Sequence, residues 1–149
     1  MSETPVPDPR LKDRAVFTAW TVDRVRYNDL DPNDHVNNNA INQFFEDGRV
    51  SFREQKLPGE AGSTLAGFVV VKFSAEYLAP VTYPGEVEVG SAILRVGRTS
   101  YTLGQGVFQG QTCIAIAEVV TVTVDPAAAK PRAIEGELRT ALEANLIES

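Results

Sequence analysis

The most regular pattern of apolar residues lies between residues 41 and 52 and has the period of an α-helix. An apolar position recurs every three or four residues, which places on one helical face Ile41, Phe44, Phe45, Gly48 and Phe52. Asparagines precede this segment and suit an N-cap, and a proline-glycine pair at 58–59 predicts its end. A glycine inside a helix costs about 1 kcal/mol relative to alanine. Gly48 therefore predicts the close approach of another element to this face.

The segments on either side of this helix alternate apolar and polar residues, as β-strands do. A first strand is predicted within residues 15–26, and four more are predicted over residues 68–78, 86–96, 99–108 and 111–124. Short turns between the later strands are typical of antiparallel meanders. A short helix is predicted over residues 135–146, with leucines in register at positions 138, 142 and 146. One long helix between the first and second strands of an antiparallel sheet predicts an α+β fold.

The last predicted strand carries a charge among apolar residues. Glu118 has the same alternation as Ile116 and Val120 on either side of it. Two interpretations stay open: a β-bulge that shifts the alternation, or a functional carboxylate on the side of the core. The bulge is the favoured interpretation.

Length and composition agree with one globular domain. The chain has 149 residues, of which 43% are hydrophobic and 23% charged, and this is enough apolar material for a core. Residues 1–14 are proline-rich and polar and are predicted to form a flexible lead-in. Residues 15–149 are predicted to form a single domain that includes the short C-terminal helix.

The net charge and the absence of targeting signals disfavour nucleic-acid-binding, membrane-spanning and secreted proteins. Fourteen lysines and arginines against twenty acidic residues give a formal net charge of −6, which disfavours general binding to nucleic acid. No apolar run approaches the roughly 20 residues of a membrane-spanning helix, and the first residues lack the apolar segment of a signal peptide. A cytoplasmic protein with no membrane partner is expected. Its one cysteine, Cys113, is expected to be a small core residue and not a nucleophile.

The residues with the most chemical potential crowd the start of the long helix. Asp29, Asp31, Asp34 and the only histidine, His35, fall within one short run. One interpretation is a turn followed by an N-cap, since aspartate and asparagine favour both. The other is a catalytic site, because unpaired N–H groups at a helix start can hold a developing oxyanion. A carboxylate beside them would deprotonate water or attack an acyl carbon.

The same run carries a resemblance to a known enzyme family. Residues 29–38, DLDPNDHVNN, followed by Phe44-Phe45-Glu46, resemble the signature of hotdog-fold thioesterases of the 4-hydroxybenzoyl-CoA thioesterase type. The D-x-N-x-H-V-N-N spacing is also similar to that of acyl-ACP thioesterases. The resemblance continues through FSAEYLAPVTYPGEVEV and VGRTSYTL and covers roughly residues 22–124. It implies a hotdog fold, in which a five- to six-stranded antiparallel sheet wraps a long central helix. It also implies a homodimer or dimer-based homotetramer with each active site at a subunit interface.

The resemblance implies roles in thioester hydrolysis for three residues. Asp31 matches the family's catalytic carboxylate and would act as a general base on water or as a nucleophile through a mixed anhydride. Asn33 would orient the thioester or the water, and His35 would polarise the carbonyl or protonate the leaving thiolate. A structural interpretation stands beside each role: an N-cap for Asp31, a turn residue for Asn33 and a hydrogen-bonding residue for His35.

Four further residues are predicted to bind substrate. Asn37 and Asn38 belong to the motif at the helix start, and Arg98 and Ser100 belong to the hairpin segment. Arg98, with Arg95, is a candidate to hold the phosphates of coenzyme A; solvated surface charges are the favoured interpretation of these two arginines. A carboxylate and oriented amides supply both base and oxyanion stabilisation. No metal and no cofactor are therefore expected beyond coenzyme A as part of an acyl-CoA substrate.

Two positions depart from the family pattern. Asp34 stands where many members have glycine, and Ile41 stands where a tyrosine is common. The first departure is expected to alter the turn or to add charge beside the thioester, and the second to change a substrate contact. The acyl-ACP enzymes are double hotdogs, so this single-domain chain is expected to use coenzyme A as the carrier.

Two other functions stay open on the same fold. One is a non-catalytic acyl-thioester binder, and the other is a hydratase-type enzyme acting on an enoyl thioester. The joint presence of Asp31, Asn33 and His35 favours the hydrolase. The acyl group stays undetermined. Three phenylalanines are candidates either for a pocket wall or for the core: Phe44, Phe45 and Phe73.

Overall fold

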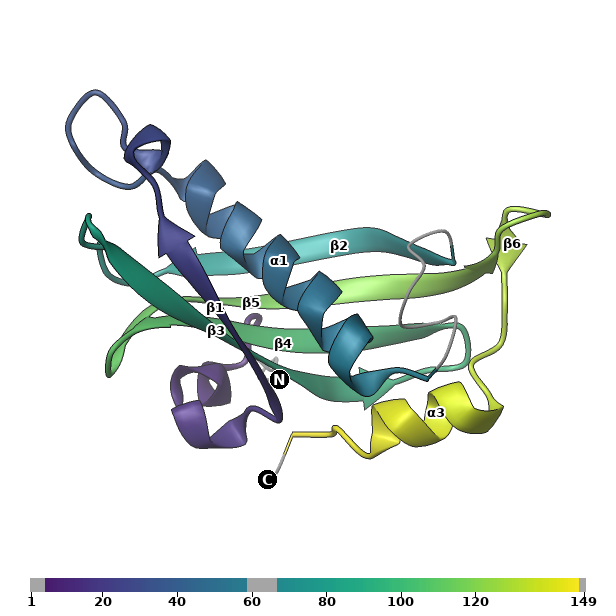
Figure 1. Ribbon diagram of the computed structural model, residues 1–149. Coiled ribbons are helices and arrows are strands. Elements are labelled where there is room, and N and C mark those ends of the chain that lie inside the picture. The colour runs from purple at the N-terminus through teal and green to yellow at the C-terminus, as the bar shows by residue number, and fades with distance from the viewer. Residues whose placement is uncertain (1–4, 59–66, 148–149) are drawn as a thin grey trace.

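The elements follow the sequence pattern closely. The computed structural model describes residues 5–58 and 67–147 (Figure 1). Its long strands are β1 Ala19–Val25, β2 Phe68–Tyr77, β3 Gly85–Val96, β4 Ser100–Gln109 and β5 Thr112–Asp125. Its helices are α1 Asn38–Lys56 and α3 Gly136–Glu143. Shorter elements are the 3-10 turns η1 Pro9–Lys12, η2 Arg14–Val16 and η3 Tyr27–Asp29, and the strand β6 Lys130–Pro131. The predicted long helix, strands and C-terminal helix are confirmed, and β6 is an addition.

The long strands form one antiparallel sheet in the order β1-β3-β4-β5-β2, and β6 pairs with the end of β5. β3, β4 and β5 follow one another as hairpins, as the short turns predict. β1 pairs with β3, whereas β2 lies at the opposite edge beside β5. The chain therefore passes through α1 from one edge of the sheet to the other. This arrangement confirms the predicted α+β hotdog fold.

α1 crosses one face of the sheet and supplies much of the core there (Figure 1). The whole predicted apolar face is buried: Ile41, Phe44, Phe45, Gly48 and Phe52. Small and β-branched residues of β3, β4 and β5 pack against it: Val87, Val89, Val107, Ala115 and Ala117. The helical period in the sequence therefore identified the side of α1 that faces the sheet.

α1 and the sheet come very close at Gly48. A β-carbon at this position would lie 2.6 Å from Val89 Cγ1 and 2.9 Å from Gln105 Nε2. Gln105 is fully buried under the helix and donates from Nε2 to Phe45 O at 3.0 Å and to Ser91 Oγ at 3.1 Å. The predicted close approach is confirmed, and it places a buried amide directly beneath the helix.

The N-terminal segment, residues 5–18, covers the opposite face of the sheet. An apolar cluster is buried beneath it: Leu11, Phe17, Phe108 and Ile116. Asp8 caps η1 by accepting the N–H of Arg10 at 2.9 Å, and Arg10 pairs with its carboxylate. The prediction of a flexible lead-in over residues 1–14 is therefore wrong for residues 5–14, because the proline-rich sequence forms 3-10 turns packed on the sheet. Residues 1–4 lie outside the described part.

Glu118 attaches this segment to the sheet. Its Oε2 accepts the N–H of Asp8 at 2.8 Å, and its Oε1 accepts from Arg95 Nη2 at 3.2 Å. β5 does contain a bulge, but the register with β4 shifts at Ile114, and Glu118 keeps the side of Ile116. The carboxylate is thus buried on the face away from α1. A bulge does not explain it; an anchor for the N-terminal backbone does.

The C-terminal helix α3 closes one end of the core. Leu142 is fully buried, and Leu138 packs beside it. Leu146, the third leucine of the predicted register, lies past the helix and bridges to Ile93.

Within residues 5–58 and 67–147, no helix combines the length and hydrophobicity needed to cross a membrane.

We expect Gly48→Ala to lower the free energy of unfolding by about 1–3 kcal/mol, because the added methyl group overlaps Val89 and Gln105. The better helix propensity of alanine, about 1 kcal/mol, offsets only part of this cost. Urea unfolding followed by circular dichroism measures the change. Glu54→Ala, on the exposed face of α1, is the control and should be nearly neutral. A stability gain for Gly48→Ala would contradict the close packing.

Candidate active site

The candidate residues lie in a tight loop between β1 and α1. An isolated bridge from Leu30 to Val36 closes the base of the loop. Inside it, Asp31 Oδ1 accepts the N–H groups of Asn33 at 2.9 Å and of His35 at 3.1 Å. The N–H of Asp31 in turn donates to His35 O at 2.7 Å. One carboxylate oxygen of Asp31 therefore organises the loop, and Oδ2 accepts no hydrogen bond from the described residues.

Asp34 has a left-handed backbone conformation. Its φ of 61° is uncommon for a residue with a side chain, whereas glycine adopts it without steric cost. The N–H of Asp34 donates to Asp31 O at 2.9 Å, so the turn depends on this conformation. Aspartate is one of the few other residues that adopt it readily. The departure from the family's glycine therefore preserves the turn and adds a negative charge to it.

The loop ends at the N-terminus of α1, where Asn37 is the N-cap. Its Oδ1 accepts the N–H of Ala40 at 2.8 Å, and its own N–H donates to Asp29 O at 2.9 Å. No described residue accepts a hydrogen bond from the N–H of Asn38 or of Asn39. These two N–H groups carry the partial positive charge of a helix start. They lie beside the loop and are available to an anion.

The first acid of the run has a structural role. Asp29 Oδ2 accepts the N–H of Arg26 at 2.7 Å and so caps the 3-10 turn η3. The turn-and-cap interpretation therefore holds for Asp29. It leaves unexplained the second oxygen of Asp31 and the exposed side chains of Asn33 and His35.

One chain does not bring all the predicted residues together. The candidates between residues 31 and 38 occupy the loop and the helix start. Arg98 lies in the β3–β4 turn and Ser100 begins β4, at the end of β3 opposite to Gly85, which pairs with Val25 close to the loop. The 12 residues of β3, at roughly 3.3 Å each, separate the two groups. Within one subunit these groups occupy opposite ends of the sheet.

A hollow of about 190 Å³ lies between α1 and β2. Five polar residues of α1 and one aromatic residue of β2 line it: Asn39, Asn42, Gln43, Glu46, Arg49 and Phe73. One end of the hollow is thus at Asn39, whose N–H is unpaired. The hydroxyl of Tyr77, at the end of β2, donates to Asn42 Oδ1. Sequence reasoning missed this hollow, because helical periodicity assigns these polar positions to solvent.

The three candidate phenylalanines divide between core and hollow. Phe44 and Phe45 are buried in the core beneath α1. Phe73 is 37% exposed and forms part of the wall of the hollow. The core interpretation is therefore confirmed for the two helical residues.

Two carboxyl groups meet on the side of α1 that faces β1. Asp23 of β1 lies near Asp47 of α1, and Gln43 Nε2 donates to Asp47 Oδ1 at 3.0 Å. Oδ2 of Asp23 is buried and has no hydrogen-bond partner among the described residues. Partial burial raises the pKa of Asp23 to about 6, with a further contribution from the neighbouring carboxylate of Asp47. The Asp23 carboxyl group is therefore mostly protonated below about pH 6.

Cys113 lies apart from this site. It packs at the edge of the apolar cluster beneath the N-terminal segment, and burial raises the pKa of its thiol. A raised pKa disfavours the thiolate, the nucleophilic form. The environment therefore favours packing over catalysis for this residue, as expected.

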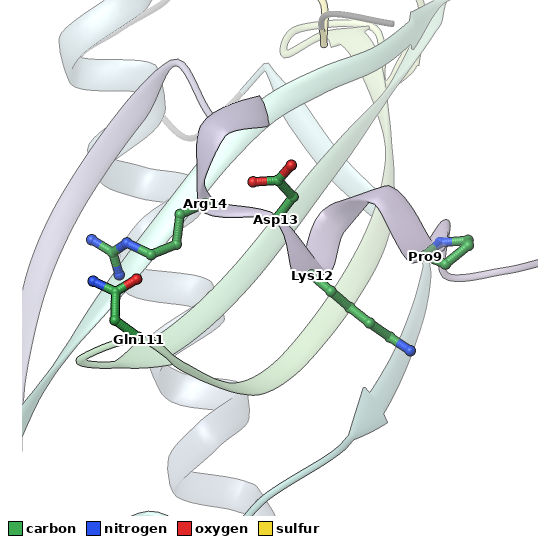
Figure 2. Close-up of a pocket in the computed structure, with 5 residues that line it drawn as sticks. All are labelled: Pro9, Lys12, Asp13, Arg14 and Gln111. Carbon is green, nitrogen blue, oxygen red and sulfur yellow. The ribbon is translucent and has the colours of Figure 1, made fainter.

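Another surface depression is also separate from this site. It measures about 450 Å³ and lies between the N-terminal segment and the β4–β5 turn, where Arg14 and Gln111 lie side by side (Figure 2). Arg14 already pairs with Glu88 at 3.0 Å and donates to Gly110 O at 3.1 Å.

Within residues 5–58 and 67–147, there is no group of three or more His, Cys, Asp or Glu side chains that could hold a metal ion.

Comparison with known proteins decides the family. The model of the thioesterase-like superfamily matches residues 25–142. The chain belongs to the thioesterase-like superfamily. A curated relative, the acyl-CoA thioester hydrolase YbgC of Escherichia coli O6:H1, is 33% identical over 122 residues, which cover 77% of this chain and 87% of that protein. The resemblance to hotdog-fold thioesterases is thereby confirmed.

Solved structures extend the likeness to the fold of this thioesterase-like chain. The PA5185 protein of Pseudomonas aeruginosa has a TM-score of 0.79 at 29% identity, over 91% of this chain and 96% of that one. A thioesterase of Thermus thermophilus, solved in complex with coenzyme A and zinc, has a TM-score of 0.78 at 26% identity, over 87% of this chain and 94% of that one.

We expect Asp34→Gly to raise the free energy of unfolding of this thioesterase-like domain by about 0.5 kcal/mol, because glycine adopts the positive φ without strain. Asp34→Ala should lower it by about 1 kcal/mol for the opposite reason. Chemical denaturation of both variants measures the order of stabilities. An alanine variant more stable than the glycine variant would exclude the left-handed conformation.

We expect Asp23→Asn to stabilise the protein above about pH 6 and to change little near pH 4. The pKa of Asp23 is about 6 in the folded protein against a model value of 3.8, so the folded state binds the proton more tightly. Wild-type stability therefore falls as pH rises between these values and is level above them. The gain at pH 8 is on the order of 1 kcal/mol, since solvent screens a partly exposed group.

Thermal unfolding of wild type and Asp23→Asn across this pH range measures the effect. Glu54→Gln on exposed α1 surface is the control for removal of a negative charge. A gain that is the same at every pH would contradict the raised pKa of Asp23.

Proposed function

We propose that the protein hydrolyses acyl-CoA thioesters to free carboxylic acids, through attack of a water molecule that Asp31 deprotonates. Membership of the thioesterase-like superfamily and the name of the curated relative support the reaction class. One observation carries the mechanism: Asp31 lies in a loop that ends at two unpaired N–H groups of α1.

Asp31 is the general base in this proposal. The N–H groups of Asn33 and His35 hold its Oδ1 and so fix the orientation of the carboxylate. Oδ2 then takes a proton from water while the water oxygen attacks the thioester carbon. Direct attack by the carboxylate to form a mixed anhydride is the alternative. The loop is open to solvent, which favours water as the attacking group.

The helix start stabilises the charge that develops in this attack. The N–H groups of Asn38 and Asn39 donate to the oxyanion formed on the former carbonyl oxygen. When the C–S bond breaks, His35 donates a proton to the thiolate of coenzyme A. Asn33 holds the attacking water in position. Asn37 supports these groups as the N-cap that sets the direction of the first turn.

The complete site belongs to a homodimer, because β2 is an unprotected edge strand. Among the described residues no strand pairs with its free side. Apolar side chains are exposed along it: Val69, Val70, Val71, Phe73 and Tyr77. A long apolar edge of this kind is a template for pairing with another strand. Antiparallel pairing with β2 of a second copy satisfies the free backbone groups, in a dimer or in a dimer-based tetramer.

Such a dimer brings together the candidate site residues that lie at opposite ends of the sheet in one subunit. Ser100 pairs with Val122, and Val122 pairs with Val69 near the start of β2. Tyr77 ends β2 beside the start of α1. Antiparallel pairing sets the start of one β2 against the end of the other. The partner subunit's Ser100 and the partner subunit's Arg98 then lie on the side of the loop, where Arg98 binds the phosphates of coenzyme A.

Coenzyme A is the proposed carrier of the acyl group. The Thermus thermophilus thioesterase, 26% identical to this chain, is solved with coenzyme A.

We expect Asp31→Asn to lower kcat by about 10²–10⁴-fold and to leave KM and the free energy of unfolding close to wild type. Asparagine keeps an oxygen for the N–H groups of Asn33 and His35 and removes only the base. Release of free thiol from short, medium, long and aromatic acyl-CoAs measures the rate and ranks the substrates. Glu54→Gln is the matched control and should retain wild-type rates.

The same acyl-CoA assays distinguish a hydrolase from a non-catalytic binder and from a hydratase-type enzyme. Turnover by the wild type that is lost in Asp31→Asn supports the hydrolase. Binding of acyl-CoA by both proteins without turnover identifies a non-catalytic binder. Hydration of an enoyl-CoA faster than hydrolysis of any acyl-CoA identifies a hydratase-type enzyme.

A further inference from the structure

The middle of α1 carries a positive charge without a partner in the described chain. Arg49 lines the hollow between α1 and β2, and its guanidinium carbon lies 5.7 Å from the ring centre of Phe73. Its Nη1 is buried and has no hydrogen-bond partner among residues 5–58 and 67–147. Nearly all buried polar groups in proteins are hydrogen-bonded. Arg49 is therefore placed for an acceptor that the described residues do not supply.

Glu46 lies one turn before Arg49 and lines the same hollow. The ion pairs in the described part of the chain include neither of these residues. Burial lowers the pKa of Arg49, and the negative charge of Glu46 acts in the opposite direction. A carboxylate and a guanidinium thus stand close together on one surface without pairing within the subunit.

Twofold symmetry sets these two residues opposite each other. Residue 47 is the centre of α1, and Phe73 lies next to the centre of β2. The rings of Phe45 and Phe73 are 5.8 Å apart, so the middle of α1 lies over the middle of β2. Antiparallel pairing of two β2 strands is longest when the twofold axis passes through their middle. The partner's α1 is then antiparallel, and a residue before one helix centre faces a residue after the other.

We propose that Arg49 of each subunit forms an ion pair with the partner subunit's Glu46 across this axis, a contact termed here the reciprocal clasp. It rests on the homodimer given under the proposed function. A twofold interface is isologous, so each contact occurs twice, and one arrangement supplies acceptors for the buried Nη1 atoms of both Arg49 side chains. This ion pair also places the partner's α1 along the hollow, so that residues of both subunits line the hollow.

An acidic group at the end of the acyl chain is the alternative partner for Arg49 in the hollow. Glu46 disfavours that occupant, because its carboxylate lines the same hollow and repels an anion. A second copy brings both charges in complementary positions. The pattern of one acid and one base a turn apart therefore fits a partner helix better than a small anion.

Charge reversal tests the clasp directly. Glu46→Arg alone brings only positive charges to the axis, and Arg49→Glu alone brings only negative ones. Each variant should raise the dissociation constant of the dimer about 100-fold or more. An equal mixture of the two variants should form a heterodimer, because every pair again joins unlike charges. The chain with both substitutions should remain a homodimer. Native mass spectrometry and light scattering measure these states.

Two controls keep the test interpretable. Glu54→Arg changes an exposed acid elsewhere on α1 and should leave both the dimer and thiol release unchanged. Thermal unfolding shows whether each single variant is folded. Where a variant does not fold alone, recovery of a folded heterodimer on co-expression with its counterpart gives the same support.

Several results would overturn the clasp. One is that both single variants remain dimers. A second is that a mixture of the two variants forms no heterodimer. A third is that Arg49→Glu remains a dimer and its KM is raised only for acyl-CoAs with a charged group at the end of the acyl chain. A wild-type monomer that releases thiol would remove the clasp and the dimer but leave the hydrolase. A clasped dimer that hydrolyses no acyl-CoA would remove the hydrolase and leave the clasp.

Discussion

The contact at Gly48 determines where the functional parts of the molecule lie. Without a side chain at this position, α1 settles against Val89 and over the buried amide of Gln105, which bonds to the helix at Phe45 O. A helix held at this depth has both of its ends fixed. Its N-terminus, capped by Asn37, is thereby set at a defined place above the sheet edge. The geometry of the loop therefore depends on packing in the middle of the helix.

In the proposed mechanism, the loop uses one carboxylate for two tasks, holding the turn and deprotonating water. Asp31 uses Oδ1 for two backbone N–H groups and leaves Oδ2 free of the described residues. A base that also ties its own loop is held in orientation before substrate arrives, which is how enzymes lower the cost of positioning. The positive φ of Asp34 completes this turn and brings the chain directly into α1.

Local patterns in the sequence predicted the elements and the loop but not the long-range contacts. The period of α1 identified its buried face, and the density of acids around His35 identified the loop. Turn lengths report only neighbouring strands, so they did not place β2 at the far edge of the sheet. Alternation along β5 did not explain Glu118, because its partners lie in a segment 110 residues away. Arg49 was missed because a polar helical face looks the same whether it meets solvent or another chain.

The hydrogen bond from Asp8 to Glu118 has a consequence for the order of folding during synthesis. The N-terminal segment leaves the ribosome 110 residues before the carboxylate that will hold it. Until then Leu11 and Phe17 have no sheet to cover, and they are open to chaperones or to other nascent chains. The hairpins from β3 to β5 close through short turns at little entropic cost. The segment around Asp8 is therefore synthesised well before β5 but is among the last parts of the domain to reach its place.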